Sequence, residues 1–270
     1  MITMALQGGL GNQMFQYALG YYTATRIRAE LVLSTGRLEG DENRQYNLGL
    51  FQGLQGQTLI DVVRRPIVKE NGLPFNSPLV DTIRDGCTLI GYWQSEKYFP
   101  GCREALNETF KSAQDWSLDA QLDLLMIQAA GPRSTFIGVR RTDYLTKLNY
   151  HGVMDAEYYR EGLRMVARKI GLVPEVFVFS DDPEWCANYL NLGYPYHILA
   201  PRPTTKTVLG REDIDITMMS VCRNAVIANS SFHWWGAWLG VDKYVIAPKR
   251  WFTAEGEDSR DIVPESWTRI

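Results

Sequence analysis

The stretch Gly8-Gly9-Leu10-Gly11-Asn12-Gln13 decides the fold, because it joins a strand-like segment at residues 2–6 to an apolar-periodic helix at 13–27. Its glycines permit positive φ and close approach of a ligand to the backbone. The helix behind them directs main-chain amides and the positive end of its dipole toward an anion. A second strand at 30–34 completes a βαβ unit, so the turn predicts an anion-binding site.

A dinucleotide fingerprint fits this turn only in part. Its third glycine is replaced by Met14, and the second strand ends in Ser34 rather than in an acid that would hold a ribose hydroxyl. No Gly-Lys-Ser/Thr follows, which excludes a Walker loop. Asn12 and Gln13 place amide side chains where a helix cap or a ligand would use them. An ordinary glycine turn with an Asn cap remains the alternative.

Composition predicts a globular protein with a substantial core: 270 residues, 45% hydrophobic, with a net charge of −3. No block of Lys or Arg occurs, which argues against nucleic acid as a partner. The four cysteines are dispersed without a C-x-x-C pair, which argues against structural zinc and fits packing roles in a reducing compartment. No run of 18 apolar residues and no signal-like start occurs, so we expect a cytoplasmic protein without a membrane segment.

The organisation along the chain predicts an α/β protein with two domains. Residues 36–78 resemble loops and short elements, and the break at 129–133 is the best candidate linker, giving domains 1–132 and 133–270. Short apolar strands separated by helices predict parallel sheets covered on both faces. The predicted strands are 87–93, 135–139, 175–179, 225–228 and 244–247, and the predicted helices include 101–110, 118–128 and 155–170.

Ligands of such sheets gather at the carboxyl ends of the strands. Arg140 and Arg141 follow the strand 135–139, and paired guanidinium groups suit an oxyanion, with Asp143 placed to orient one of them. The alternative is a surface Arg–Asp pair of little energetic value. Asp181 and Asp182 follow the strand 175–179. One of them suits a helix cap, and the other suits hydrogen bonds to guanine or to a ribose.

A second anion-ready helix start follows the strand 225–228. Asn229, Ser230, Ser231 and Phe232 lead into an aromatic-rich helix, and the serines either bind an anion or only cap the helix. We expect the tryptophans at 234, 235 and 238 to pack in the core. Asp213-Ile214-Asp215 resembles a metal-binding D-x-D, but it stands at the front of an apolar helical run and is interpreted as a helix start. Two helix starts and an arginine pair point to a nucleotide diphosphate, without a metal.

The chain resembles glycosyltransferase family 11, the α-1,2-fucosyltransferases, over nearly its whole length. The motifs that carry the resemblance are residues 8–18, 92–99, Gly138-Val139-Arg140-Arg141-Thr142-Asp143-Tyr144, 179–182, Asp215 with 218–220, and 229–232 with the following Trp-Trp-Gly-Ala. The resemblance implies the GT-B architecture, two facing Rossmann-like domains with parallel sheets, in which 1–132 is the acceptor side and 133–270 binds the GDP-sugar. It also implies GDP-β-L-fucose as donor, inversion, no metal or other cofactor, and a glycan acceptor, with a galactoside 2-hydroxyl expected.

One position departs from the family pattern His-x-Arg-Arg-x-Asp-Tyr, because Gly138 stands where the pattern has the histidine. The glycine removes an imidazole and is expected to leave room. An altered donor pose, another GDP-sugar, or a catalytically weakened protein that binds the sugar or GDP all remain open.

These motifs predict a set of roles. Arg140, the serines and the Phe232 amide hold the diphosphate, assisted by Arg141, Asn229, Gly9, Gly11, Asn12 and Gln13, while Asp181 binds guanine or ribose and Asp143 orients an arginine. His151 and Asp155 are two candidates for the base that takes the acceptor proton. The loops 36–78 and 145–154 are expected to shape the acceptor pocket.

Overall fold

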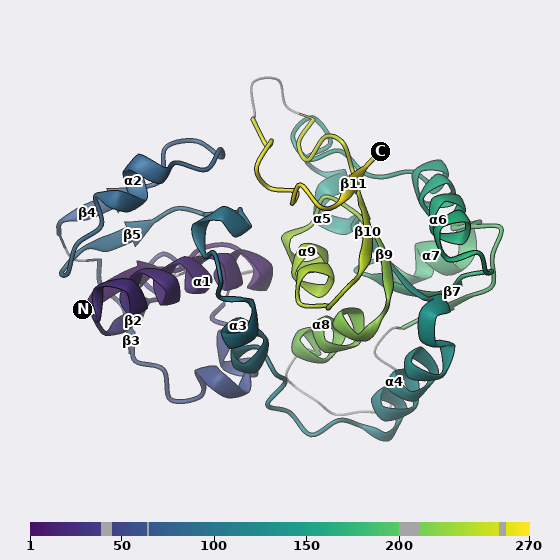
Figure 1. Ribbon diagram of the computed structural model, residues 1–270, viewed down its shortest axis with the longest axis horizontal. Helices are drawn as coiled ribbons and strands as arrows, with labels where there is room; N and C mark the ends of the chain where they lie inside the picture. The colour runs from purple at the N-terminus through teal and green to yellow at the C-terminus, as the bar shows by residue number, and fades with distance from the viewer. Residues whose placement is uncertain (39–44, 64, 200–210, 254–257) are drawn as a thin grey trace. The chain divides into compact units, whose positions relative to one another are not determined.

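The protein is described by a computed structural model over residues 1–38, 45–63, 65–199, 211–253 and 258–270. The chain divides into two units: Met1–Ala113 with Glu257–Pro264, and Gln114–Gly256 with Glu265–Ile270 (Figure 1). The domain boundary expected after residue 132 thus falls one helix later in the chain than the boundary between the units. The break predicted at 129–133 is a turn inside the second unit, because helix α4 (Leu118–Ala130) runs through a single 3₁₀ turn, Gly131–Arg133, into a strand.

The first unit holds a parallel sheet with the strand order β3-β2-β1-β5-β4. Its strands are β1 (Ile2–Ala5), β2 (Leu31–Ser34), β3 (Leu59–Ile60), β4 (Ile67–Lys69) and β5 (Thr88–Ile90), and its helices are α1 (Leu10–Ile27), α2 (Ser77–Asp81) and α3 (Arg103–Thr109). The predicted strands at 2–6, 30–34 and 87–93 are confirmed in shortened form. Two further strands lie in the segment where loops and short elements were expected.

The glycine turn of the first unit is tighter than predicted. Helix α1 begins at Leu10 rather than at Gln13, so Gly11 lies in its first turn. Gly8 has a φ of +75°, where a Cβ would lie 2.5 Å from the side-chain nitrogen of Asn12. Gly9 has an ordinary φ of −75°, so positive φ is required at Gly8 and not at Gly9.

The second unit holds a parallel sheet with the strand order β11-β10-β9-β6-β7-β8. Its strands are β6 (Ser134–Val139), β7 (Glu175–Ser180), β8 (Tyr196–Ile198), β9 (Asn224–Ile227), β10 (Tyr244–Ala247) and β11 (Thr268–Arg269). Besides α4 its helices are α5 (Thr142–Leu145), α6 (Ala156–Ile170), α7 (Pro183–Tyr189), α8 (Glu212–Val221) and α9 (Ser231–Trp238). The helix start predicted at the D-x-D sequence is confirmed as the first turn of α8.

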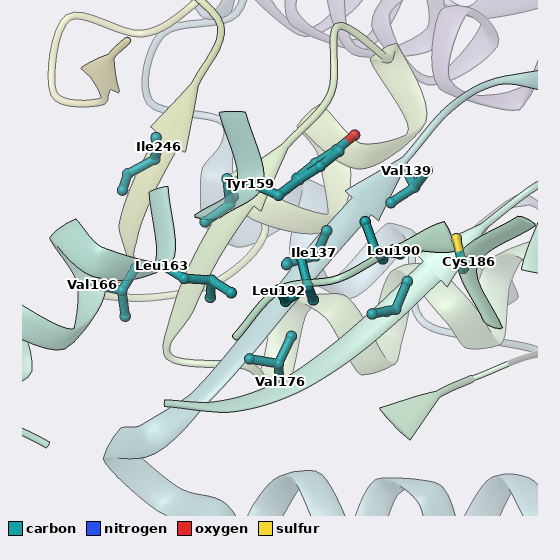
Figure 2. Close-up of a cluster of buried hydrophobic side chains, with 12 residues drawn as sticks. Ile137, Val139, Tyr159, Leu163, Val166, Val176, Cys186, Leu190, Leu192 and Ile246 are labelled. Atoms are coloured by element: carbon teal, nitrogen blue, oxygen red, sulfur yellow. The ribbon is translucent and has the colours of Figure 1, made fainter. Parts of the chain in front are cut away.

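In the core of the second unit, the strand β6 lies between the helix α6 on one face of the sheet and the helix α9 on the other. Ile137 and Val139 pack with Tyr159 and Leu163 of α6, and Figure 2 shows these side chains pointing toward one another. Successive residues of a strand point to opposite faces. Gly138, between those two residues, therefore faces away from α6, toward the helix α9, whose tryptophans at 234, 235 and 238 are buried as predicted.

Candidate functional site

The strands β7, β6 and β9 lie side by side and are parallel, so their carboxyl ends meet at one edge of the sheet. Arg140 follows β6 directly and Asp181 follows β7. The guanidinium of Arg140 lies 2.7 Å from a carboxylate oxygen of Asp143 and 3.4 Å from one of Asp181. The structure thus brings together three of the residues that the sequence placed in one site.

Arg140 is the cation of this edge. Burial opposes its charge, but Asp181 and Asp143 outweigh that effect and raise its pKa above the ordinary arginine value. Its side chain keeps 27% of its surface exposed, and its guanidinium lies 5.5 Å from the centre of the Tyr144 ring. Arg140 is therefore held in place by neighbours on two sides while part of it stays open to a ligand.

Arg141 has different surroundings, so the predicted arginine pair is split. Its guanidinium lies 3.7 Å from the centre of the Trp185 ring, and its Nε lies 3.4 Å from a carboxylate oxygen of Asp182. Asp182 also caps α7 by accepting a hydrogen bond from the Trp185 amide at 3.1 Å, which confirms the predicted acidic cap. A guanidinium stacked on an indole in this way ties the β6 loop to α7.

Asp181 organises the loop after β6. One of its oxygens accepts from the Arg141 amide at 2.9 Å, and the other accepts from the amide of Thr142 at 3.0 Å and from its hydroxyl. The carboxylate therefore fixes the backbone that carries both arginines. Its expected contact with guanine or ribose stays a prediction.

The start of α9 is the second part of the site. Ser230 is the N-cap residue, yet its side chain makes no capping hydrogen bond. The first hydrogen bond within the helix runs from the Trp234 amide to the Ser230 carbonyl at 2.9 Å, so the amides of Ser231, Phe232 and His233 precede it. The Ser230 hydroxyl therefore does not cap this helix, which rules out that alternative for Ser230.

Asn229 holds this helix start in place. Its side-chain nitrogen donates to the carbonyls of His151 at 2.6 Å and Trp251 at 2.9 Å, and its own carbonyl accepts from the Tyr144 hydroxyl at 2.9 Å. These bonds join α5, the loop before α6 and the segment after β10 to the start of α9. The side chain of Asn229 thus supports the site from behind, and a direct contact with the donor stays a prediction.

The two candidate bases differ in their surroundings. The His151 ring stacks on Tyr144 with centroids 4.1 Å apart and an angle of 7° between the rings. Burial, together with the charges of Lys147 and Arg140, lowers its pKa below the ordinary histidine value, although the charge of Asp143 acts in the opposite direction. Asp155 instead is the N-cap of α6 and accepts from the Tyr158 amide at 2.8 Å. Neither base role is tested by these contacts.

In the first unit, the residues that were predicted to contact the GDP-sugar lie around the start of α1. The Asn12 side-chain oxygen accepts from Gln94 at 2.7 Å, and the amides of Asn12 and Gln13 both donate to the Gly9 carbonyl. Gln13 is fully buried, and its side chain bonds the main chain of Gly8, Gln45 and Asn47. The structure gives Gln13 a supporting role, and the donor contacts of Gly9, Gly11, Asn12 and Gln13 stay predictions.

A model of glycosyl transferase family 11 matches residues 82–270 of the chain. The chain belongs to this family. An alpha-1,2-colitosyltransferase of Escherichia coli is 31% identical over 294 residues, covering 100% of the chain and 98% of the relative. The O-antigen biosynthesis glycosyltransferase WbnK of Escherichia coli is 27% identical over 307 residues, covering 98% and 99%. The family 11 resemblance of the motifs is thus confirmed, and the chain is a glycosyltransferase.

A solved structure supports the fold of this family 11 chain. The ADP-heptose lps heptosyltransferase II of Escherichia coli aligns with 100% of the chain and 89% of its own length, at a TM-score of 0.51 and 13% identity. The α/β class and the GT-B type are confirmed by this likeness together with the two parallel sheets. In the described part of the chain, no helix is long and apolar enough to span a membrane, and no three His, Cys, Asp or Glu side chains gather as metal ligands would.

Two features of this family 11 chain were not predicted from its sequence. The expectation that Gly138 leaves room is wrong, because the His233 ring fills that space. In the first unit Glu70 accepts the amides of Tyr92 at 2.6 Å and Trp93 at 3.0 Å, and burial raises its pKa to about 7. It holds a bend in which Trp93 has a φ of +58°. Glu70 lies in the segment 36–78, where loops and short elements were expected. It therefore did not follow a predicted strand, which is where functional residues were sought.

Proposed function

We propose that this family 11 chain transfers L-fucose, or a deoxy relative of it, from a GDP-linked donor to a glycan hydroxyl, with inversion and in an α-1,2 linkage. The observation that carries the proposal is Arg140, a half-buried cation at the end of β6, on the same sheet edge as the uncapped start of α9. A guanidinium and a helix start together suit a diphosphate.

The acceptor oxygen attacks the anomeric carbon of the donor in line, and the bond from that carbon to the β-phosphate oxygen breaks. The electron pair leaves with GDP, while a base takes the acceptor proton. Because negative charge grows on the β-phosphate, the main catalytic task is to stabilise it. Arg140 is assigned to the β-phosphate, and Ser230, Ser231 and the Phe232 amide to the remaining phosphate oxygens.

The supporting contacts assign the other roles. Asp143 and Asp181 keep Arg140 charged and oriented, as their ion pairs indicate. Arg141, stacked on Trp185, is assigned to holding the loop and the edge of the nucleotide site. His151 is the favoured base over Asp155, because a neutral imidazole accepts a proton while the Asp155 carboxylate is engaged at the start of α6.

The donor sugar is the point where two candidates compete. The motifs resemble fucosyltransferases, whereas a full-length relative at 31% identity is a colitosyltransferase. Colitose lacks one hydroxyl that L-fucose carries. A site built to bond that hydroxyl strongly rejects the sugar that lacks it, whereas a site without such a bond only weakly rejects the sugar that carries it. A strong preference for the GDP-fucose donor would therefore indicate a protein group bonded to this hydroxyl.

Turnover of a panel of GDP-sugars tests the proposal. The purified chain is incubated with GDP-fucose, GDP-colitose or GDP-mannose and an array of galactoside, N-acetylglucosamine and rhamnoside acceptors, followed by linkage analysis. We expect transfer from the first or the second donor, in an α-1,2 linkage, that persists in EDTA. Activity abolished by chelation would contradict the metal-free mechanism. GDP binding by calorimetry without any product would favour the weakened binding protein instead.

A further inference from the structure

A buried imidazole occupies the space beside Gly138. This glycine lies in β6, paired with Phe179 of β7 on one side and with Ile227 of β9 on the other. A Cβ at position 138 would lie 2.4 Å from Cγ of His233 and 2.5 Å from its Nδ1. Carbon atoms do not approach so closely, so a side chain at 138 and the His233 ring compete for one volume.

Neither partner of this contact can easily move away. The Gly138 carbonyl accepts hydrogen bonds from the Ala228 amide at 3.0 Å and from the Tyr159 hydroxyl at 3.1 Å. His233 belongs to α9, where Gly236 packs so tightly on α8 that a Cβ there would lie 2.6 Å from the Met219 Cβ. The strand and the helix are therefore both anchored, and the close approach is a fixed feature of the unit.

The His233 ring is uncharged and has unused hydrogen-bonding capacity. Its Nδ1 is buried and has no hydrogen-bond partner among the residues that the structure describes. Burial first, and the charge of Arg140 second, lower its pKa to about 3. At neutral pH it thus carries no charge for a phosphate and is too weak a base to take the acceptor proton. It therefore contributes shape and an uncharged hydrogen-bonding group next to β6, the strand that leads to Arg140.

We propose that His233 is a positioning residue of the donor site: its ring provides from α9 the imidazole that the strand β6 lacks at Gly138, packs on this glycine, and so fixes the end of the strand from which Arg140 extends. This inference rests on the proposed function, in which Arg140 holds the β-phosphate. Gly138 and His233 form a matched pair: the glycine is needed because the histidine is present, and the histidine restores the polar group that the glycine removes.

Four variants test the pair. His233→Leu keeps a buried side chain of similar size without polar atoms, and His233→Asn keeps a polar group near the position of Nδ1. Gly138→His with His233→Ala returns the imidazole from the other element. His197→Ala is the matched control, because His197 lies half-exposed on β8, where it pairs with Glu175. Thermal unfolding, GDP affinity by calorimetry, and the donor kcat and KM are measured for each.

We expect His233→Leu to fold and to lose about tenfold or more in kcat with little change in the donor KM, since misplacing a charge-stabilising group by a fraction of an ångström affects the transition state most. His233→Asn should recover part of this loss. The kcat of the Gly138→His/His233→Ala variant should return to within about tenfold of the wild-type value. His197→Ala should have the kcat of the wild type.

Wild-type kcat and donor KM in His233→Leu would overturn the inference, because the ring would then only fill space. If His233→Leu does not fold, the double variant decides alone: turnover within about tenfold of the wild type supports the pair, and an inactive or unfolded double variant overturns it. Failure of the proposed function itself would appear elsewhere, as absence of GDP binding by the wild type or full activity of Arg140→Ala.

Discussion

Replacing Arg140 by alanine removes the cation of the proposed diphosphate site and leaves two carboxylates behind. Asp143 and Asp181 lie 2.7 and 3.4 Å from its guanidinium. Without the guanidinium, both negative charges face the place where the β-phosphate is expected. The substitution therefore converts a site whose anions are partly neutralised into one that repels the leaving group.

The size of the effect follows from Coulomb's law. A guanidinium and a phosphate charge about 4 Å apart attract by about 4 kcal/mol at an effective dielectric constant of about 20. Removal of a preorganised charge-stabilising donor typically costs about 3 to 4 kcal/mol, or a factor of roughly 10² to 10³ in rate. Arg140→Ala should lose at least that much in kcat, and Arg140→Lys, which keeps the charge without the planar fork, should fall between it and the wild type.

The assay is GDP release with the preferred donor, together with thermal unfolding to show that the variants fold. Arg164→Ala is the matched control, because this arginine pairs with Glu157 and Glu161 on the exposed side of α6, and it should behave as wild type. Retention of more than about a tenth of wild-type turnover in folded Arg140→Ala would refute the assigned role.

Ser230→Ala should weaken GDP binding yet change the free energy of unfolding by less than about 0.5 kcal/mol, because the hydroxyl makes no capping bond; a stability loss without a change in affinity would contradict this. Asp155→Ala should lose about 1 kcal/mol of stability while Asp155→Ser keeps both stability and turnover, and an inactive, folded Asp155→Ser would make Asp155 the base instead. If His151 is the base, the acid limb of kcat/KM lies below the ordinary histidine pKa, and His151→Phe, which keeps the stack on Tyr144, abolishes that limb with most of the turnover; an unchanged profile would exclude it. The folded pKa of His233 lies near 3, below its unfolded value, so its contribution to stability is complete above about pH 6.5 and is lost as the pH falls toward 3; melting temperatures against pH should fall less steeply in His233→Leu than in the wild type.

The fold was largely predictable because its main strands are apolar runs followed by polar residues. The buried strands β6, β7 and β9 have four to six residues, enough for a local signal. The strands β3, β8 and β11 have two or three residues, and such short segments carry no period. They are strands only because a neighbouring strand offers its edge, which is a tertiary effect.

The site was predictable as far as strand order alone determines it. Because the carboxyl ends of parallel strands meet, sequence was enough to gather Arg140, Asp143 and Asp181. Packing decided the rest: Arg141 stacks on Trp185 of α7, and His233 fills the space at Gly138. Those contacts join residues far apart in the chain, and no spacing along the sequence reveals them.

In the proposed mechanism, Arg140 and the start of α9 neutralise the departing diphosphate. A crystal structure of the chain with GDP tests it most directly. We expect phosphate oxygens within hydrogen-bond distance of the Arg140 guanidinium and of the segment Ser230, Ser231 and Phe232. Well-defined density for the diphosphate away from these groups would contradict it.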